Sequence, residues 1–181
     1  MDELWNNVLK SQFLAAIDML EKPIIACREE LWKETLWNDP EAPAGFAEFW
    51  YVAFHTLFWL DLYLSGKEEG FIPPAPFDLN ELEPGLMPGR NYTKSELLVY
   101  LEYCRQKCQD TINRLTDKDI QEPCEFSWKG KVSFAELLLD NMRHVQEHSA
   151  QLSMFLGQQG GWTSRWVGRV EDDSGAAKPL A

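Results

Sequence analysis

The chain has 181 residues, and 45% of them are hydrophobic, which suits one folded domain and excludes wholesale disorder. The formal net charge is −12 at pH 7, and the sequence pI is near 4.7. This balance argues against nucleic acid or an anionic membrane as the main partner, because phosphate groups are bound by Lys and Arg.

The N-terminus, MDELWNNVLK, has no basic start followed by an apolar run, so we do not expect it to be a secretory signal. The four cysteines form no CxxC pair and are expected to be reduced thiols of a cytoplasmic protein. Cys104 and Cys108 lie four residues apart on an expected helix. They are either small core residues or a pair of ligands for a soft metal.

The apolar segment from Phe46 to Leu64 is nearly as long as the roughly 20 residues that a membrane span needs. However, Glu48, His55 and Asp61 interrupt it. We therefore predict a buried helix of a protein that does not enter the membrane.

Four helices are predicted in chain order. The first runs from about Asp2 to Leu20, and Pro23 then breaks or kinks it. The second covers about residues 43–65 and ends at Gly66.

The third helix begins at Thr93, which forms a capping box with Glu96. The fourth begins at Ser133, which has the same relation to Glu136, and it runs to Leu156. Residues 125–132 alternate around Lys-Gly and predict a small hairpin before this last helix.

Residues 66–91 form a long connection rich in proline and glycine, which is either a plain strap or a functional cover. Because it is long, it permits a crossover between the second and third helices. The predicted fold is all-α: a four-helix bundle with up-down-down-up order over residues 1–157. Residues 158–181 are a C-terminal tail whose last dozen residues are expected to be disordered.

The three histidines of the chain all lie in predicted helices. His144 and His148 are four residues apart, which places their Cβ atoms about 5–6 Å apart on one helical face. That face also carries Leu137, Val145 and Leu152, so both imidazoles point inward. Buried imidazoles need partners, and one metal ion would satisfy both.

His55 lies on the second helix, which is apolar on both faces. We expect the face with His55 to pack in the core. The face with Phe49, Ala53 and Leu57 is expected to pack against a second subunit, making a homodimer.

These residues resemble the DinB/YfiT-like superfamily of four-helix bundles. Its members carry one metal-binding histidine on the second helix and two on the fourth, in a motif like His-x-x-x-His-Arg-Gly-Gln-aliphatic. Here the fourth helix reads His144-Val-Gln-Glu-His148-Ser-Ala-Gln151-Leu152, with Ser-Ala in place of Arg-Gly. Asp140 stands where many members have a further histidine.

The resemblance implies a divalent metal, zinc or nickel, held by His55, His144 and His148. It also implies a metal-dependent thiol S-transferase or related hydrolase, acting on a low-molecular-weight thiol and a small electrophilic substrate. Three protein ligands leave a coordination position for water or a thiol. One alternative is a metal-stabilised binding or stress-response module without turnover, and another is the same fold without any metal.

Five further residues are candidates around this centre. Glu48, Tyr51 and Asn141 would line the pocket, and Glu147 and Gln151 would orient imidazole N–H groups. For each of them, ordinary helix packing or solvation is the competing interpretation.

Overall fold

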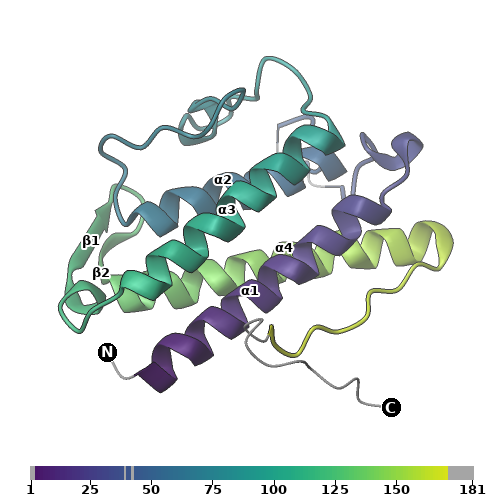
Figure 1. The fold of residues 1–181 in the computed structure, drawn as a ribbon. Helices are drawn as coiled ribbons and strands as arrows, with labels where there is room; N and C mark the ends of the chain where they lie inside the picture. Colours follow the sequence, from purple (N-terminus) through teal and green to yellow (C-terminus); the bar gives the residue numbers. More distant parts are fainter. Residues whose placement is uncertain (1–2, 39, 42, 171–181) are drawn as a thin grey trace, which may run out of the picture.

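The computed structural model describes residues 3–38, 40–41 and 43–170. Within them the chain is mostly helical, with four long helices and one two-stranded hairpin (Figure 1). The helices are α1 (Glu3–Ala26), α2 (Phe49–Ser65), α3 (Lys94–Arg114) and α4 (Phe134–Gly160). Helix α1 packs on α3 and α4, and α2 packs on the same two helices.

Helix α1 does not end at Pro23. It continues for one further turn to Ala26, so the predicted end at Leu20 and a break at Pro23 are wrong, while the alternative of a kink stays a prediction. Proline removes one backbone donor, but the Pro23 carbonyl still accepts a hydrogen bond from the Cys27 N–H at 2.9 Å. A short 3₁₀ turn, η1 (Glu29–Leu31), follows.

Helix α2 begins at Phe49, later than predicted, because the segment before it is held in an extended bridge between Thr35 and Glu48. It ends as predicted at Gly66, whose φ of 72° is the left-handed conformation that favours glycine. None of the helices in the described part of the chain has the length and apolarity of a bilayer-spanning segment.

Both faces of α2 are covered within the one chain. Phe49, Ala53 and Leu57, on the face expected to be free, are each 0% exposed. The prediction that this face packs against a second subunit is therefore wrong, because the face is already buried within the one chain. A homodimer stays a prediction that needs another surface.

The capping box before α3 is confirmed, and the one before α4 is confirmed in its first half, the hydrogen bond that Ser133 accepts. Thr93 and Glu96 form the complete capping box at the start of α3. Ser133 accepts from the Glu136 N–H at the start of α4. Strands β1 (Pro123–Phe126) and β2 (Gly130–Ser133) pair antiparallel, as the predicted hairpin before α4.

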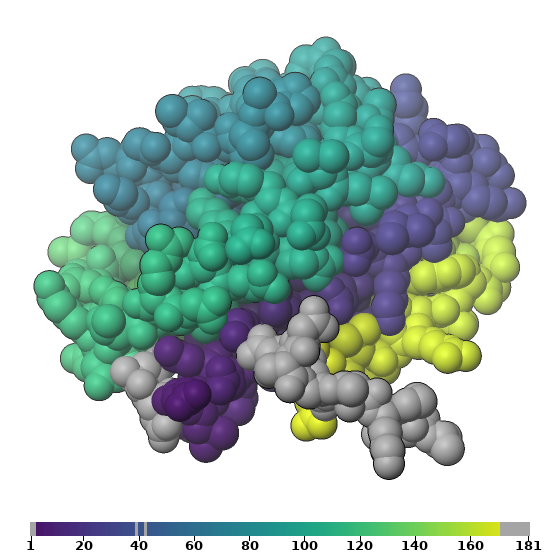
Figure 2. Space-filling model, in the orientation of Figure 1, coloured from purple at the N-terminus to yellow at the C-terminus, as the bar shows by residue number. Residues whose placement is uncertain are grey.

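Helix α4 continues past Gly157 and ends at Gly160, so the predicted end at Leu156 is too early. The segment 161–170 then runs back along α1, where Ser11 Oγ donates to the Val170 carbonyl at 2.6 Å. Figure 2 shows this segment, in yellow, lying against α1 in purple. The disorder predicted for the last dozen residues falls almost wholly on residues 171–181, which lie outside the described residues.

The connection between α2 and α3 passes over these two helices (Figure 1) and includes one 3₁₀ turn, η2 (Asn80–Leu82). Phe71 packs edge-on against Phe58 of α2. Phe77 stacks on Tyr100 of α3, with ring centroids 4.3 Å apart. The connection is thus part of the core and carries η2 to the inner face of α2.

Candidate metal centre

The three histidines converge on one point between α2 and α4. His144 Nε2 lies 3.2 Å from His55 Nε2 and 3.0 Å from His148 Nε2. One ligand atom from each residue lies within 4.8 Å of the other two. The convergence expected from the four-residue spacing and from the position of His55 is therefore confirmed as geometry.

The outer nitrogens of two imidazoles face hydrogen-bond acceptors. His148 Nδ1 donates to Gln151 Oε1 at 2.7 Å, and His55 Nδ1 contacts Glu81 Oε1. The Gln151 oxygen can only accept, so His148 Nδ1 carries the proton and His148 Nε2 presents its lone pair to the centre. A proton on His55 Nδ1, facing Glu81, would direct the Nε2 lone pair of His55 to the centre in the same way. His144 Nδ1 is buried and has no hydrogen-bond partner in the described part of the chain.

Burial keeps two of these rings neutral. It lowers the pKa of His144 to about 2, with further lowering by the neighbouring His55 and His148. The pKa of His148 is also lowered, mainly by burial and to a smaller extent by the nearby His55. Neutral imidazole is the form that binds a metal ion, so no proton has to be displaced from these rings near neutral pH.

The arrangement fits a divalent ion. A tetrahedral metal with imidazole nitrogens at about 2.0–2.1 Å separates its ligands by about 3.3 Å, close to the separations of 3.0 and 3.2 Å found here. Nitrogen lone pairs that converge without a cation repel each other. In His144 no hydrogen bond to the buried Nδ1 atom offsets this repulsion among the described residues. Among the described residues, no further His, Cys, Asp or Glu joins the set, which leaves room for an exogenous ligand.

Two of the five further candidates were predicted to orient imidazoles. Gln151 does so through its contact with His148, as predicted. Glu147 is exposed, and no hydrogen bond to an imidazole is recorded for it. It affects His148 only as a nearby charge.

The predicted pocket residues have other partners. The Tyr51 hydroxyl donates to Glu81 Oε2 at 2.6 Å, while Glu48 accepts from the Trp50 indole N–H at 2.6 Å. Burial and the adjacent Glu81 carboxylate raise the pKa of Tyr51, so that its hydroxyl stays a donor.

Asn141 is fully buried one turn before His144. Its Nδ2 donates to the Leu60 carbonyl at 3.1 Å, which joins α4 to α2. Its Oδ1 has no recorded partner in the described structure. The residue therefore acts in helix packing here and makes no hydrogen bond to a candidate ligand.

Glu81 was missed in the sequence. It lies in η2, inside a connection without periodicity, where acidic residues are expected to face solvent. Only the fold shows that its side chain is 4% exposed and contacts His55. The number of acidic residues in so long a connection is the only hint the sequence offers.

An aromatic group borders the site on the hairpin side. Trp59 of α2 packs edge-on against Trp128, with ring centroids 5.1 Å apart. The Trp128 indole N–H donates to the Tyr63 hydroxyl at 3.2 Å. Asp140, which stands in place of a further histidine, instead accepts from Lys129 at 2.7 Å.

The four cysteines are free and buried. Burial raises the pKa of Cys27 and of Cys108 to about 12, and it also raises those of Cys104 and Cys124. Because the thiolate is the reactive form, none of these side chains has the character of a nucleophile. The interpretation of Cys104 and Cys108 as small core residues is the one that their burial supports.

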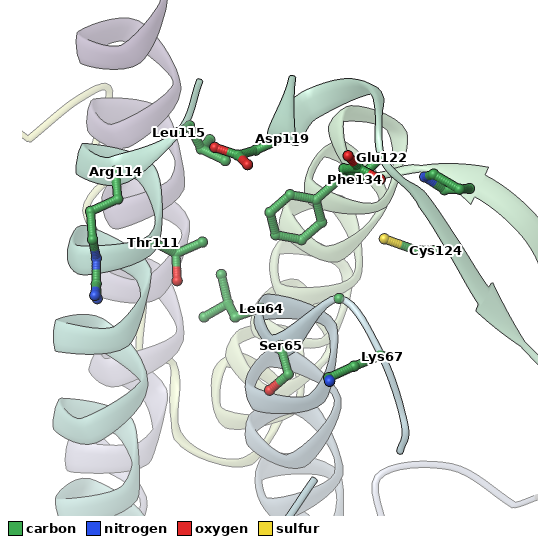
Figure 3. Close-up of a pocket in the computed structure, with 12 residues that line it drawn as sticks. Leu64, Ser65, Lys67, Thr111, Arg114, Leu115, Asp119, Glu122, Cys124 and Phe134 are labelled. Carbon is green, nitrogen blue, oxygen red and sulfur yellow. The ribbon is translucent and has the colours of Figure 1, made fainter. Parts of the chain in front are cut away.

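A separate cavity of about 460 Å³ lies where α2 and α3 end beside the hairpin (Figure 3). Leu64, Thr111, Cys124 and Phe134 are among its lining residues, and no histidine lines it. Along α2, Leu64 is nine residues beyond His55, which is about 14 Å of helix. The cavity is therefore distinct from the histidine cluster.

The sequence profile of the DinB superfamily matches residues 15–152 of this chain. The chain belongs to the DinB superfamily. The crystal structure of a DinB-like protein from Bacillus subtilis is similar to it, with a TM-score of 0.56 and 14% sequence identity. The similarity covers 85% of this chain and 93% of that one. At this identity it shows the fold alone, and a comparison with curated proteins found no match.

The region that matches the DinB superfamily contains His55, Glu81, His144 and His148. The end of α4 and the segment 161–170 lie beyond it. In this member of the DinB superfamily the candidate centre therefore lies within the matched region, and the docked C-terminal segment lies outside it.

Proposed function

We propose that this chain is a metal-dependent enzyme in which His55, His144 and His148 hold one divalent ion, zinc or nickel. The observation that carries the proposal is the convergence of three Nε2 atoms, with 3.0 and 3.2 Å between neighbours. Imidazole ligands suit both ions. The membership of the DinB superfamily supports the same ligand set.

The proposed reaction is transfer of a thiol to a small electrophile, or a related hydrolysis. A divalent ion with a free coordination position lowers the pKa of a bound thiol or water and supplies a nucleophile at neutral pH. Three neutral ligands leave the charge of the ion largely in place, which favours a thiolate. The thiol has to come from the substrate, because the pKa values of all four cysteines are raised by burial.

The chain's own residues orient the ligands and limit access. Gln151 orients the His148 ring through a hydrogen bond from His148 Nδ1, and Glu81 orients the His55 ring through its contact with His55 Nδ1. The His55 side chain is 29% exposed, so the centre is reachable from solvent on this side. Trp59 and Trp128 border the approach and offer apolar surface to a small electrophile.

Two further features belong to the proposal. The helices would form an up-down-down-up bundle, which the pairwise packing of α1 and α2 on α3 and α4 supports. A cytoplasmic location is supported by the four free thiols.

Metal analysis of the purified protein tests the first step. We expect about one equivalent of transition metal per chain, lost when the three histidines are replaced by alanine and retained in Arg143→Ala, an exposed position on α4. Less than about half an equivalent, unchanged in the triple variant, would end the proposal.

Activity requires a separate measurement, with a panel of thiols and electrophiles assayed before and after removal of the metal by a chelator. Turnover that needs the metal supports the transferase. Stoichiometric metal without turnover across the panel favours the alternative, a metal-stabilised binding or stress-response module.

A further inference from the structure

Glu81 reaches the candidate centre from a segment that does not belong to the four helices. It lies in η2, 26 residues after His55, in the connection between α2 and α3. Its side chain is only 4% exposed, whereas Glu83 on the same connection is exposed. The fold thus buries the Glu81 carboxylate beside the candidate centre and leaves Glu83 in solvent.

Three side chains of α2 surround this carboxylate at four-residue intervals. The Tyr51 hydroxyl donates to Oε2 at 2.6 Å, and the Trp59 indole N–H donates to Oε1 at 3.0 Å. His55 Nδ1 contacts the same Oε1. The inner face of α2 therefore presents three donors in a row to a single acceptor group.

In the described part of the chain, the carboxylate has no Lys or Arg partner. Among the described residues, its only recorded ion pair is with His55, whose ring carries charge only when protonated. Burial of a carboxylate without a cation is unfavourable, even when hydrogen bonds satisfy both of its oxygens. A positive charge on the far side of the His55 ring would compensate it.

A purely structural role would not need this charge. If Glu81 served only to fasten the connection to α2, a neutral glutamine in its place could accept from Trp59 and His55 through its oxygen and donate its NH2 to the Tyr51 hydroxyl oxygen. The second ligand shows this alternative within the same molecule, since His148 Nδ1 donates to the neutral amide of Gln151 at 2.7 Å. The two imidazoles are therefore held by similar geometry and differ in the charge behind them.

We propose that Glu81 is a positioning residue of the metal centre, which keeps the His55 proton on Nδ1 and offsets part of the charge of the bound ion. The proposal rests on the metal site proposed above. A carboxylate behind a ligating imidazole makes the ring more basic and aims its free nitrogen at the metal. The long connection thereby contributes directly to the affinity of a site whose ligands it does not supply.

The test is zinc affinity, measured by competition with a chromophoric chelator, for the wild type, Glu81→Gln and Glu81→Ala. Exposed Glu83→Gln is the matched control. We expect about 10-fold weaker binding for Glu81→Gln, up to about 100-fold weaker binding for Glu81→Ala, and wild-type affinity for the control. The reciprocal change, Gln151→Glu, places a carboxylate behind His148 and should tighten zinc binding.

Urea unfolding of the metal-free proteins separates this role from a structural one. Glu81→Gln removes a buried charge, so its urea midpoint without metal should equal or exceed that of the wild type. Wild-type zinc affinity in Glu81→Gln, or a loss of metal-free stability large enough to explain weaker binding, would overturn the role of Glu81 alone. A wild-type protein that binds neither zinc nor nickel would instead remove the metal centre itself, and this proposal with it.

Discussion

A buried ion pair holds α2, which carries His55, against α3. Asp61 of α2 is 0% exposed, and the Lys107 ammonium of α3 donates to its carboxylate, to its backbone carbonyl at 2.9 Å and to Ser65 Oγ at 2.6 Å. The Tyr100 hydroxyl donates to the second carboxylate oxygen at 3.0 Å. Each of the three ammonium protons thus has an acceptor.

Removing either partner should have unequal effects. Lys107→Met keeps the aliphatic stem but leaves the Asp61 charge buried with one donor, which costs about 3–5 kcal/mol. Because the Lys107 side chain is 23% exposed and water can enter, we expect the lower end, about 3 kcal/mol. Asp61→Asn removes the buried charge and leaves an ammonium that can reach water, so about 1 kcal/mol is expected.

Urea unfolding of the metal-free protein measures both variants and the double variant. The double variant should resemble Asp61→Asn, which gives a coupling energy of about 3 kcal/mol in magnitude. For a chain of this size, a loss of about 3 kcal/mol corresponds to about 6–12 °C in Tm.

The pH dependence of the stability loss in Lys107→Met gives an independent check that the buried Asp61 charge causes it. Burial raises the pKa of Asp61 above its ordinary value of 3.8, although Lys107 and Tyr100 lower it in part. Without Lys107 this pKa rises further, so the penalty in Lys107→Met is full above the folded pKa and fades as pH falls through it. The deficit should therefore shrink between pH 7 and about pH 4. Equal losses in the two single variants, or a deficit that does not change with pH, would refute this reasoning.

Three more predictions concern the centre, a helix cap and the thiols. His144→Leu removes the buried nitrogen without a partner, so it should stabilise the metal-free protein by about 1 kcal/mol in urea unfolding. With zinc at about 1,000 times its Kd, the wild type gains about 4 kcal/mol of stability and becomes the more stable of the two. If the His144→Leu variant gains the same stability from zinc, His144 is not a ligand. Hydrogen bonds from Arg90 and Thr93 lower the pKa of Glu96 from 4.5 to about 2, so the stabilisation by this carboxylate is present above pH 4.5 and is lost as pH falls towards 2. Glu96→Gln should cost about 1 kcal/mol at pH 7, with the difference from wild type decreasing below pH 4.5 in thermal melts, and a constant difference would contradict the cap. Because all four cysteines are buried, the native protein should react with less than about one equivalent of an aromatic disulfide reagent at pH 8, and the unfolded protein with all four, so rapid labelling of the native form would show an accessible thiolate.

Features that depend on neighbours within one helical turn could be predicted from the sequence alone. The capping residues Thr93 and Ser133, the glycine stop at Gly66 and the pairing of His144 with His148 on one face all belong to this class. Each depends on hydrogen bonds or side-chain spacing over three or four residues, which the order of the residues already determines.

Only the tertiary structure decided what depends on segments far apart in the chain. It brought His55 to His144 and His148 on α4 and placed Glu81 against the outer nitrogen of His55. It also buried both apolar faces of α2, one of which the sequence had assigned to a second subunit. It also carried α1 past Pro23 and laid the segment 161–170 along that helix. These outcomes follow from packing in three dimensions, where burial and charge compensation between distant residues outweigh local preference, and no periodicity in the sequence records them.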